Sequence, residues 1–528
     1  MVNVARNAPA EVRASSRAGS TTIHVAGIGG LFLAAGMVAT SAIGWLYDDP
    51  AAGHLVAAGV GVGAVSFMMW RFSKPAASLS RTAAFTAVSF AWIYAFGVAT
   101  VPYLLAGTFD TFINALFESV SGLTTTGSTV LADIEAQGKG LLLYRQYTQW
   151  FGGGGIVLLA VAVLPGFGVG GLELAGAEIA GPAADKLAPR VASTARRLWS
   201  VYVLLTAAVA AGLMVVGVGP YDAVAHAMTA IPTAGFSTFN DSIAHFDSAA
   251  VEAVLVIGML AGGTNFALQY RALIRGPGQL IRSPEFRTYL TVFIAGTAAV
   301  VAVNLGDGMA VGSALRDSVF NVTTTLTTCG FGTSDFTLWA PPAQLLLVLF
   351  MLVGGMTGST SGGIKMLRLR VELAHLWRDL RQTRQPRRVL VVRLGQVAVS
   401  DQAVARIGAF ITLYLVTILA GTFLITLFGE DLLTAFSGSV SDIGLVGPAL
   451  GDAGPASNFL AYSEPSRAVL IVLMFLGRME LHVAFLMFAA PFDSVRRRRH
   501  EHRRAHPPAA PATALQGLHP GGTHDHEA

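Results

Sequence analysis

Ten long apolar segments constrain the fold of this chain more than any other feature. A helix that crosses a bilayer needs about 20 mostly apolar residues. Charged residues make up only 12% of the 528 residues, about half the share that is usual in soluble proteins. The sequence therefore predicts an all-α polytopic membrane protein with spans near 24–46, 54–70, 84–105, 141–164, 198–218, 250–270, 287–304, 342–364, 406–428 and 465–490.

The basic residues predict which side of the membrane each connection faces. If the N-terminus is inside, the two ends and alternate connections hold 30 of the 35 Lys and Arg residues. Cytoplasmic segments carry such an excess of Lys and Arg. We therefore expect both termini in the cytoplasm, together with the long basic loop at 365–393.

Four shorter segments between the spans share a pattern that repeats along the chain. Each has a semi-apolar, helix-like stretch followed by a glycine among small or hydroxyl residues, at 117–129, 226–238, 321–333 and 436–448. The key glycines, Gly127, Gly235, Gly330 and Gly444, are separated by 108, 95 and 114 residues. Repetition on this scale predicts four helix–loop–helix units.

These four segments indicate a cation pore. Non-helical backbone at membrane depth must line water or be enclosed by protein, because amides left unpaired in lipid are too costly. Four loops can close a ring, and a ring of carbonyl oxygens can replace the water shell of a monovalent cation. The helix-like stretch before each glycine would direct its negative C-terminal end at the pore. The alternative is that the segments are ordinary re-entrant caps.

The four segments resemble the pore loops of the Trk/Ktr/HKT potassium-transporter superfamily. Three further stretches are similar to its hallmarks, namely Gln-Trp-Phe-Gly-Gly-Gly-Gly-Ile (149–156), Gly-Gly-Met-Thr-Gly-Ser-Thr-Ser-Gly-Gly-Ile-Lys (354–365) and Leu-Gly-Arg-Met-Glu (476–480). The likeness covers about residues 20–490, and the two extra N-terminal spans make the chain similar to the TrkH branch. It implies four pseudo-symmetric helix–pore-loop–helix repeats around a central pore, preceded by two extra transmembrane helices.

The resemblance also implies a division of the chain into seven parts. A cytoplasmic N-terminal segment (1–23) and a two-helix addition (24–81) precede the four pore repeats. A basic, His-rich cytoplasmic tail, expected to be disordered, follows them. The repeats and the tail are expected at 82–197, 198–286, 287–405, 406–490 and 491–528.

By this resemblance each pore loop contributes three residues to a potassium filter. The candidates are Thr125, Thr126, Gly127, Thr233, Ala234, Gly235, Thr328, Cys329, Gly330, Asp442, Ile443 and Gly444. Cys329 stands where the superfamily more commonly has threonine, and Asp442-Ile443-Gly444 is a poor match to Thr-Thr-Gly. Asp442 either faces the permeation path, where it would deepen the cation well, or points backwards and holds the loop.

A run of glycines and hydroxyls interrupts the eighth apolar span. A helix does not easily persist through such residues, so we expect it to break below the filter. The resemblance implies an intramembrane gating loop at 354–363, with candidate residues Gly354, Gly355, Gly358, Ser359, Gly362 and Gly363. The alternative is a tight helix crossing through small residues, which is also what we expect of Gly152–Gly155.

Two further polar residues fall within apolar surroundings. Arg478 lies 13 residues into its span, roughly 20 Å deep, where a charge facing lipid is costly. The resemblance implies that it is an electrostatic barrier beneath the filter, whereas the alternative is pairing with loop carbonyls. His226, just before the second loop, could relay protons or be a hydrogen-bonded structural residue.

The sequence thus predicts the pore-forming subunit of a potassium uptake system in a bacterial inner membrane. The resemblance implies a homodimer docked on cytoplasmic nucleotide-binding regulatory subunits similar to TrkA. The basic loop at 365–393 either is their docking surface or only sets the topology of the chain. Potassium ion is the expected ligand, without a covalent cofactor, an enzymatic activity or a nucleic-acid partner. A sodium-permeable relative and an intramembrane hydrolase are the alternatives. Coupling to protons, to sodium or to nothing stays open.

Overall fold

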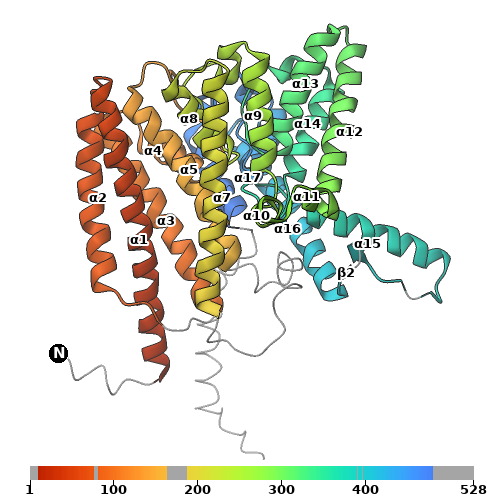
Figure 1. The fold of residues 1–528 in the computed structure, drawn as a ribbon, viewed down its shortest axis with the longest axis horizontal. Helices are drawn as coiled ribbons and strands as arrows, with labels where there is room; N and C mark the ends of the chain where they lie inside the picture. Colours follow the sequence, from red (N-terminus) through yellow and green to blue (C-terminus); the bar gives the residue numbers. More distant parts are fainter. Residues whose placement is uncertain (1–9, 77–80, 163–186, 389, 395–396, 480–528) are drawn as a thin grey trace, which may run out of the picture.

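The structure is a computed structural model that describes residues 10–76, 81–162, 187–388, 390–394 and 397–479. Its long helices run side by side, with shorter helices and loops between them (Figure 1). The predicted tail at 491–528, including its histidines, lies outside the described residues. So do the first nine residues and the segment at 163–186.

Each predicted span contains a helix in the described part of the chain, although residues 480–490 of the tenth span lie outside that part. These helices are α1 (Ala10–Leu46), α2 (Ala52–Phe72), α3 (Arg81–Ala106), α5 (Lys139–Ala162), α7 (Leu187–Val215), α9 (Ala249–Gly262), α12 (Pro284–Gly306), α14 (Pro341–Val353), α16 (Asp401–Leu427) and α18 (Glu464–Arg478). Within the described residues, six of them are long and apolar enough to cross a membrane. The fold is that of an all-α polytopic membrane protein.

The span predicted at 250–270 is not one straight helix. It breaks after Gly262, and α9 meets α10 (Phe266–Arg275) at 104°. The break follows from local sequence, because the Asn265 side chain accepts a hydrogen bond from the Leu268 amide and so caps the start of α10. The short α11 (Gly278–Arg282) then leads into α12.

One further helix lies between the two predicted spans of each repeat. These four pore helices are α4 (Phe112–Thr124), α8 (Pro220–Ala230), α13 (Val311–Leu326) and α17 (Leu432–Gly444). Contacts link the repeats in cyclic order, α5 with α8, α9 with α13, α14 with α17, and α18 with α4. The fourth repeat therefore packs against the first, and the four units close into a ring.

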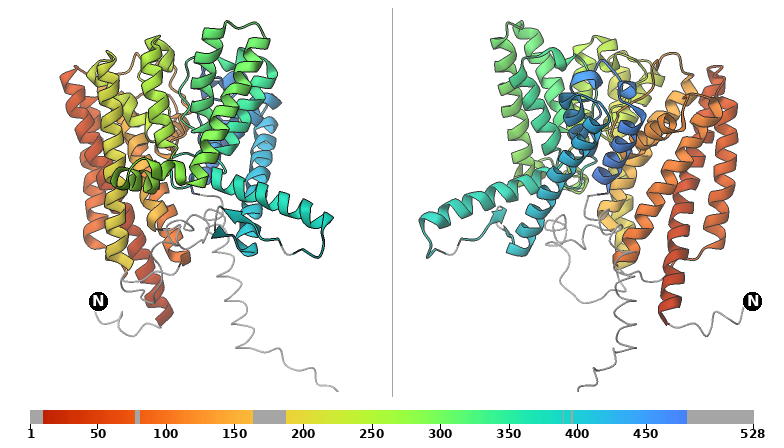
Figure 2. Two further views of the ribbon diagram at one scale, coloured as in Figure 1. Left: turned by 45° about the vertical axis from the view of Figure 1, so that its right-hand side comes forward. Right: turned by 180° about the vertical axis from the view of Figure 1, so that it is seen from behind.

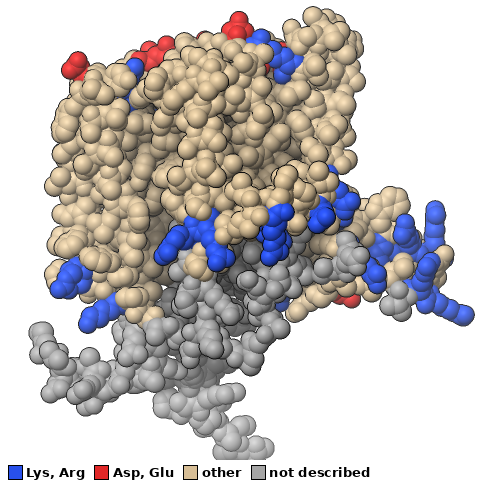
Figure 3. Space-filling view, viewed as in Figure 1, with Lys and Arg blue, Asp and Glu red and all other residues tan. Residues whose placement is uncertain are grey.

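The two edges of this ring differ in charge. In Figure 3, Lys and Arg gather along the lower edge, while most of the visible Asp and Glu lie along the upper edge. The lower edge also carries α15 (Met366–Arg384), which extends sideways from the body in both further views (Figure 2). A hairpin of β1 (Arg393–Leu394) and β2 (Val397–Ala398) follows α15. This separation of charge is the pattern that basic cytoplasmic connections produce.

Candidate cation site

All four pore helices end in the same backbone motif. Each is followed by a non-glycine residue in the left-handed conformation, with φ of 60° at Thr125, 54° at Thr233, 56° at Thr328 and 58° at Leu445. The amide of the next residue donates to the carbonyl five residues earlier, at 2.9 Å for Thr126, 2.9 Å for Ala234, 2.8 Å for Cys329 and 2.9 Å for Val446. This arrangement is a Schellman-type helix end, and it turns the chain sharply at the same place in each repeat.

A glycine with positive φ follows two residues after each left-handed residue. These glycines are Gly127, Gly235, Gly330 and Gly447, with φ of 90°, 80°, 87° and 104°. The four loops that they define are loop 1 (125–129), loop 2 (233–237), loop 3 (328–332) and loop 4 (445–449). Glycine adopts positive φ without steric cost, which explains why this residue recurs at the third position.

In the fourth loop this register differs from the sequence prediction by three residues. Asp442, Ile443 and Gly444 form the last turn of α17, whereas Leu445, Val446 and Gly447 have the backbone conformation of Thr125, Thr126 and Gly127. The prediction aligned Gly444 because it follows small and polar residues, as the other glycines do. Gly444 instead lies against the Met351 carbonyl and the Tyr414 hydroxyl.

The four positive-φ glycines meet one another in cyclic order. A Cβ atom on Gly127 would collide with the Ala234 carbonyl, one on Gly235 with the Cys329 carbonyl, and one on Gly330 with the Val446 carbonyl. A Cβ on Gly447 would lie 2.8 Å from the Thr126 carbonyl oxygen, which closes the cycle. Only glycine allows four backbones to approach so closely.

One cavity opens above this ring of glycines. It has a volume of about 70 Å³ and is lined by all four positive-φ glycines. Among the described residues that line this cavity, Arg145 is the only charged one. A cation in the ring would therefore meet backbone carbonyl and hydroxyl oxygens rather than carboxylates, as in a carbonyl filter.

Asp442, in the last turn of α17, is fully buried. The Ser128 hydroxyl in loop 1 donates to its Oδ1 at 2.5 Å. Its Oδ2 has no hydrogen-bond partner among the described residues. Of the two orientations considered for Asp442, the geometry favours the one that holds a loop, since this carboxylate joins the base of loop 4 to loop 1.

The side chains of Cys329 and His226 each contact neighbouring residues of the protein. The Cys329 sulfur lies 4.0 Å from the Thr229 carbonyl of α8, so it packs against the second pore helix. His226 Nδ1 lies 2.7 Å from the Asp222 carbonyl, and its Nε2 lies 2.9 Å from the Ser237 hydroxyl. Both ring nitrogens thus have partners, which matches the structural interpretation of this histidine.

The predicted break in the eighth span is confirmed. Helix α14 ends at Val353, and residues 354–365 are non-helical until α15 begins at Met366. This intramembrane loop (354–365) is enclosed by protein, as backbone outside a helix must be at membrane depth. Its Met356 amide donates to the Gly263 carbonyl at 2.9 Å, and Asn265 donates to the Thr357 carbonyl at 2.6 Å.

The intramembrane loop lies directly against the pore loops. The Thr360 hydroxyl donates to the Ile231 carbonyl at 2.9 Å and lies 3.2 Å from the Thr233 hydroxyl of loop 2. The Gly362 amide donates to the Thr328 hydroxyl of loop 3 at 2.7 Å. A Cβ on Gly362 would collide with the Gly444 carbonyl at the end of α17. Gly362 therefore contacts the C-terminal ends of both α13 and α17.

Other predicted gating residues surround these contacts. Gly354 and Gly363 lie against each other, both with positive φ, and Gly358 lies against Asn265. Gly355 lies against the Ser361 side chain, and the Ser359 hydroxyl donates to the Met356 carbonyl at 2.6 Å. These contacts hold the loop in a compact fold.

The buried Arg478 joins the intramembrane loop to the first repeat. Its guanidinium donates to the Gly152 carbonyl at 2.7 Å and to the Thr360 carbonyl at 3.4 Å. The carbonyl pairing considered for this arginine is therefore present. The glycines of the 149–156 stretch pack closely, as expected, since a Cβ on Gly152 would collide with the Leu123 carbonyl and one on Gly153 with Pro232.

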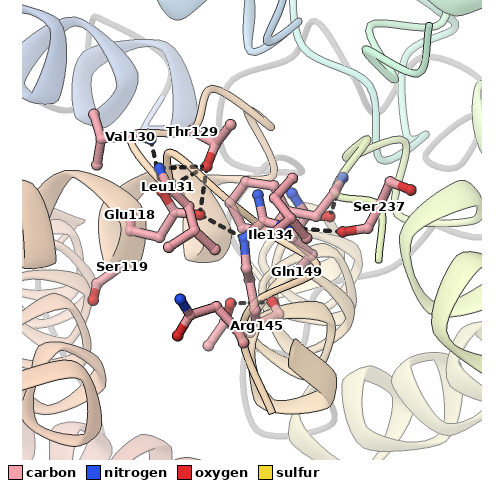
Figure 4. A network of polar contacts seen from close by, with 12 residues as sticks. Glu118, Ser119, Thr129, Val130, Leu131, Ile134, Arg145, Gln149 and Ser237 are labelled. Carbon is pink, nitrogen blue, oxygen red and sulfur yellow. Dashed lines mark hydrogen bonds and ion pairs between the residues drawn. The ribbon is translucent and has the colours of Figure 1, made fainter. Parts of the chain in front are cut away.

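Three polar residues beside the loops were not among the predicted site residues. Glu118 on α4 and Arg145 on α5 form a buried ion pair, and Gln149 lies one turn further along α5 (Figure 4). Gln149 donates to the Ala234 carbonyl at 2.6 Å and accepts from the Phe236 amide at 3.0 Å. Opposite charges at 118 and 145, each within an apolar stretch, were the signal that could have revealed the pair.

Comparison with known proteins identifies the family. Residues 62–498 match the TrkH family model, described as cation transport protein. The chain is 33% identical to the Trk system potassium uptake protein TrkH of Salmonella typhimurium, over 81% of this chain and 89% of that protein. It is 34% identical to the protein of the same name from Halomonas elongata, over 82% and 90%.

The fold agrees with this assignment. The crystal structure of the potassium transporter TrkH from Vibrio parahaemolyticus superimposes with a TM-score of 0.82 at 29% identity, covering 89% of this chain and 98% of that one. These matches and the four cyclic repeats agree on the family. The chain belongs to the TrkH family of cation transport proteins.

Proposed function

We propose that this protein is the pore-forming subunit of a Trk-type system and takes up potassium across the bacterial inner membrane. The observation that carries the proposal is the ring of Gly127, Gly235, Gly330 and Gly447, in which the backbone of each loop contacts the next. The relatives named as potassium uptake proteins support the choice of ion. The potassium ion is cargo, and the protein is a transporter rather than an enzyme.

The filter proposed here consists of Thr125–Gly127, Thr233–Gly235, Thr328–Gly330 and Leu445–Gly447. Dehydrated potassium exchanges its water shell for carbonyl oxygens of these residues. The four pore helices end at the loops, so their C-terminal dipoles favour a cation there. Glycine at 127, where sodium-transporting plant members of the superfamily have serine, favours potassium over the sodium-permeable alternative.

The intramembrane loop is the proposed gate. Its contacts with the ends of α8, α13 and α17 place it against the pore loops, and Arg478 adds a positive charge that opposes cations. Because the loop contacts loops 2 and 3 through side-chain hydroxyls, a small displacement would release those contacts without unfolding a helix. Opening of the gate is then a rearrangement of residues 354–365.

The regulatory assembly is a homodimer on cytoplasmic, TrkA-like nucleotide-binding subunits. The segment 365–393 supports docking, because α15 projects from the basic edge and carries Arg378, Arg381 and Arg384. Arg381→Glu/Arg384→Glu should abolish co-purification with the regulator and leave uptake by the isolated pore intact. Loss of uptake by a folded double variant would contradict this docking role.

Reconstitution tests the transport proposal. Purified protein in proteoliposomes with an outward potassium gradient should take up rubidium, with strong competition by potassium and weak competition by sodium. Gly235→Ala should lose this uptake, whereas Gly306→Ala is a matched control, since a Cβ on Gly306 has open space around it. Equal competition by sodium and potassium would favour the sodium-permeable alternative.

A further inference from the structure

A buried ion pair lies at the junction of loops 1 and 2. Arg145 Nε is 2.5 Å from Glu118 Oε1, and the two side chains are 2% and 0% exposed. Isolated buried charges are strongly unfavourable, so each is retained only with a partner. Figure 4 shows the pair between the two loops, with Glu118 toward loop 1 and Arg145 toward Ser237 of loop 2.

Each member of the pair holds one loop. Glu118 accepts hydrogen bonds from the Thr129 hydroxyl at 3.0 Å and from the Val130 amide at 3.0 Å. Arg145 donates to the Ser237 carbonyl at 3.0 Å, and its guanidinium lies 3.5 Å above the Phe236 ring. The pair thus fixes the chain directly after the two glycines Gly127 and Gly235.

Loops 3 and 4 are held at comparable places by neutral groups. Asn321 donates to the Ser334 hydroxyl at 3.0 Å after loop 3, and the Leu450 amide donates to the Ser437 hydroxyl at 3.0 Å after loop 4. After the glycine, hydrogen bonds between neutral groups therefore hold both of these loops, although the Asp442 carboxylate also joins the base of loop 4 to loop 1. Anchoring alone does not require the charges of Glu118 and Arg145.

The position of Arg145 explains the charges. Arg145 lines the cavity above the four glycines, where a cation enters the filter. A guanidinium at this mouth would repel cations, and Glu118 is the carboxylate that neutralises it. We propose that Glu118 is a positioning residue that both orients Arg145 and cancels its charge, so that the neutral pair permits cation entry. The inference rests on the proposed cation pathway.

A double-mutant cycle on rubidium uptake tests the proposal. Glu118→Gln leaves Arg145 without its counter-charge and should lower uptake at subsaturating rubidium about tenfold, within the range that local charge changes ion access. Glu118→Gln/Arg145→Gln removes both charges and should regain most of that loss. The same cycle on Glu252 and Arg316, an ion pair with Arg316 37% exposed, serves as the control and should change uptake less than twofold.

Charge balance makes a second, independent prediction. Arg145→Gln leaves the buried Glu118 carboxylate without its counter-charge, one side chain away from the cavity, and should strengthen external block by barium about tenfold, an effect that loop distortion by itself would not produce. If Glu118→Gln does not fold, Arg145→Gln and the double variant still test the charge-balance role. Both are then compared with Arg145→Lys. Arg145→Lys keeps the charge and should keep the wild-type barium affinity.

The outcomes separate this inference from the proposed function. A wild-type protein that takes up no cation would overturn the proposed function and this inference with it. A transporting wild type whose folded double variant is no better than Glu118→Gln would overturn the charge-balance role alone. Unchanged barium block in Arg145→Gln would do the same.

Discussion

The register of the fourth loop can be tested with two alanine substitutions three residues apart. Gly447→Ala places a side chain at φ 104°, and the left-handed region costs a non-glycine residue roughly 1–2 kcal/mol. The new Cβ would also lie 2.8 Å from the Thr126 carbonyl oxygen and 3.1 Å from the Gly127 carbonyl carbon. Carbon atoms normally pack at about 3.5–4.0 Å, so loop 1 must move.

The expected loss of transport follows from these two terms. Strain and displacement together amount to about 2 kcal/mol, and 1.36 kcal/mol corresponds to a factor of ten in rate. Because the contact is with backbone of loop 1, the cost falls on the filter itself. Gly447→Ala should therefore lower rubidium uptake about thirtyfold and weaken discrimination against sodium.

Gly444→Ala is the matched variant in the same segment. Gly444 ends α17 without positive φ, and alanine is favoured over glycine in a helix by about 1 kcal/mol. Its Cβ would meet the Met351 carbonyl oxygen at 3.1 Å and the Val446 side chain at 3.3 Å, but no backbone atom of the ring of glycines. Gly444→Ala should keep uptake within about threefold of wild type, consistent with an energy change well under 1.36 kcal/mol.

The assay is rubidium uptake into proteoliposomes that contain equal amounts of folded protein, with sodium and potassium as competitors. Loss of uptake in Gly444→Ala together with normal, selective uptake in Gly447→Ala would refute the structural register. That result would restore Asp442–Gly444 as the fourth filter element.

Three further predictions concern ion choice and gating. Gly127→Ser should raise sodium permeation relative to potassium, because its Cβ meets the Ala234 carbonyl and displaces it; unchanged selectivity in flux competition would count against the filter assignment. Shortening 354–363 should increase flux with selectivity largely intact, and a folded deletion variant that conducts no faster would favour a packing role for this segment. Arg478→Ala should raise potassium flux and weaken control by the cytoplasmic partner, since it removes both the charge and the hydrogen bonds to Gly152 and Thr360. Wild-type flux in a correctly inserted Arg478→Ala protein would exclude the barrier role.

Local sequence properties were enough to predict the order of the helices, the four repeats and the break after Val353. Apolar length determines whether a segment can span a bilayer, and a run of glycines and hydroxyls ends a helix wherever it occurs. The glycines of loops 1, 2 and 3 could be located for the same reason, since each follows a hydroxyl-rich or small-residue turn at a matching distance from its span.

Other features were decided only by contacts between residues far apart in the chain. The left-handed residue of loop 4 is Leu445, which nothing in its own sequence favours for that conformation; it is defined by the end of α17 and by the packing of Gly447 on Thr126. Glu118 and Arg145 become partners because α4 and α5 bring together residues 27 positions apart. Arg478 finds its acceptor at Gly152, 326 residues away. Buried charges and backbone ring contacts depend on tertiary packing, because their partners lie on other helices or in other repeats and no local pattern specifies them.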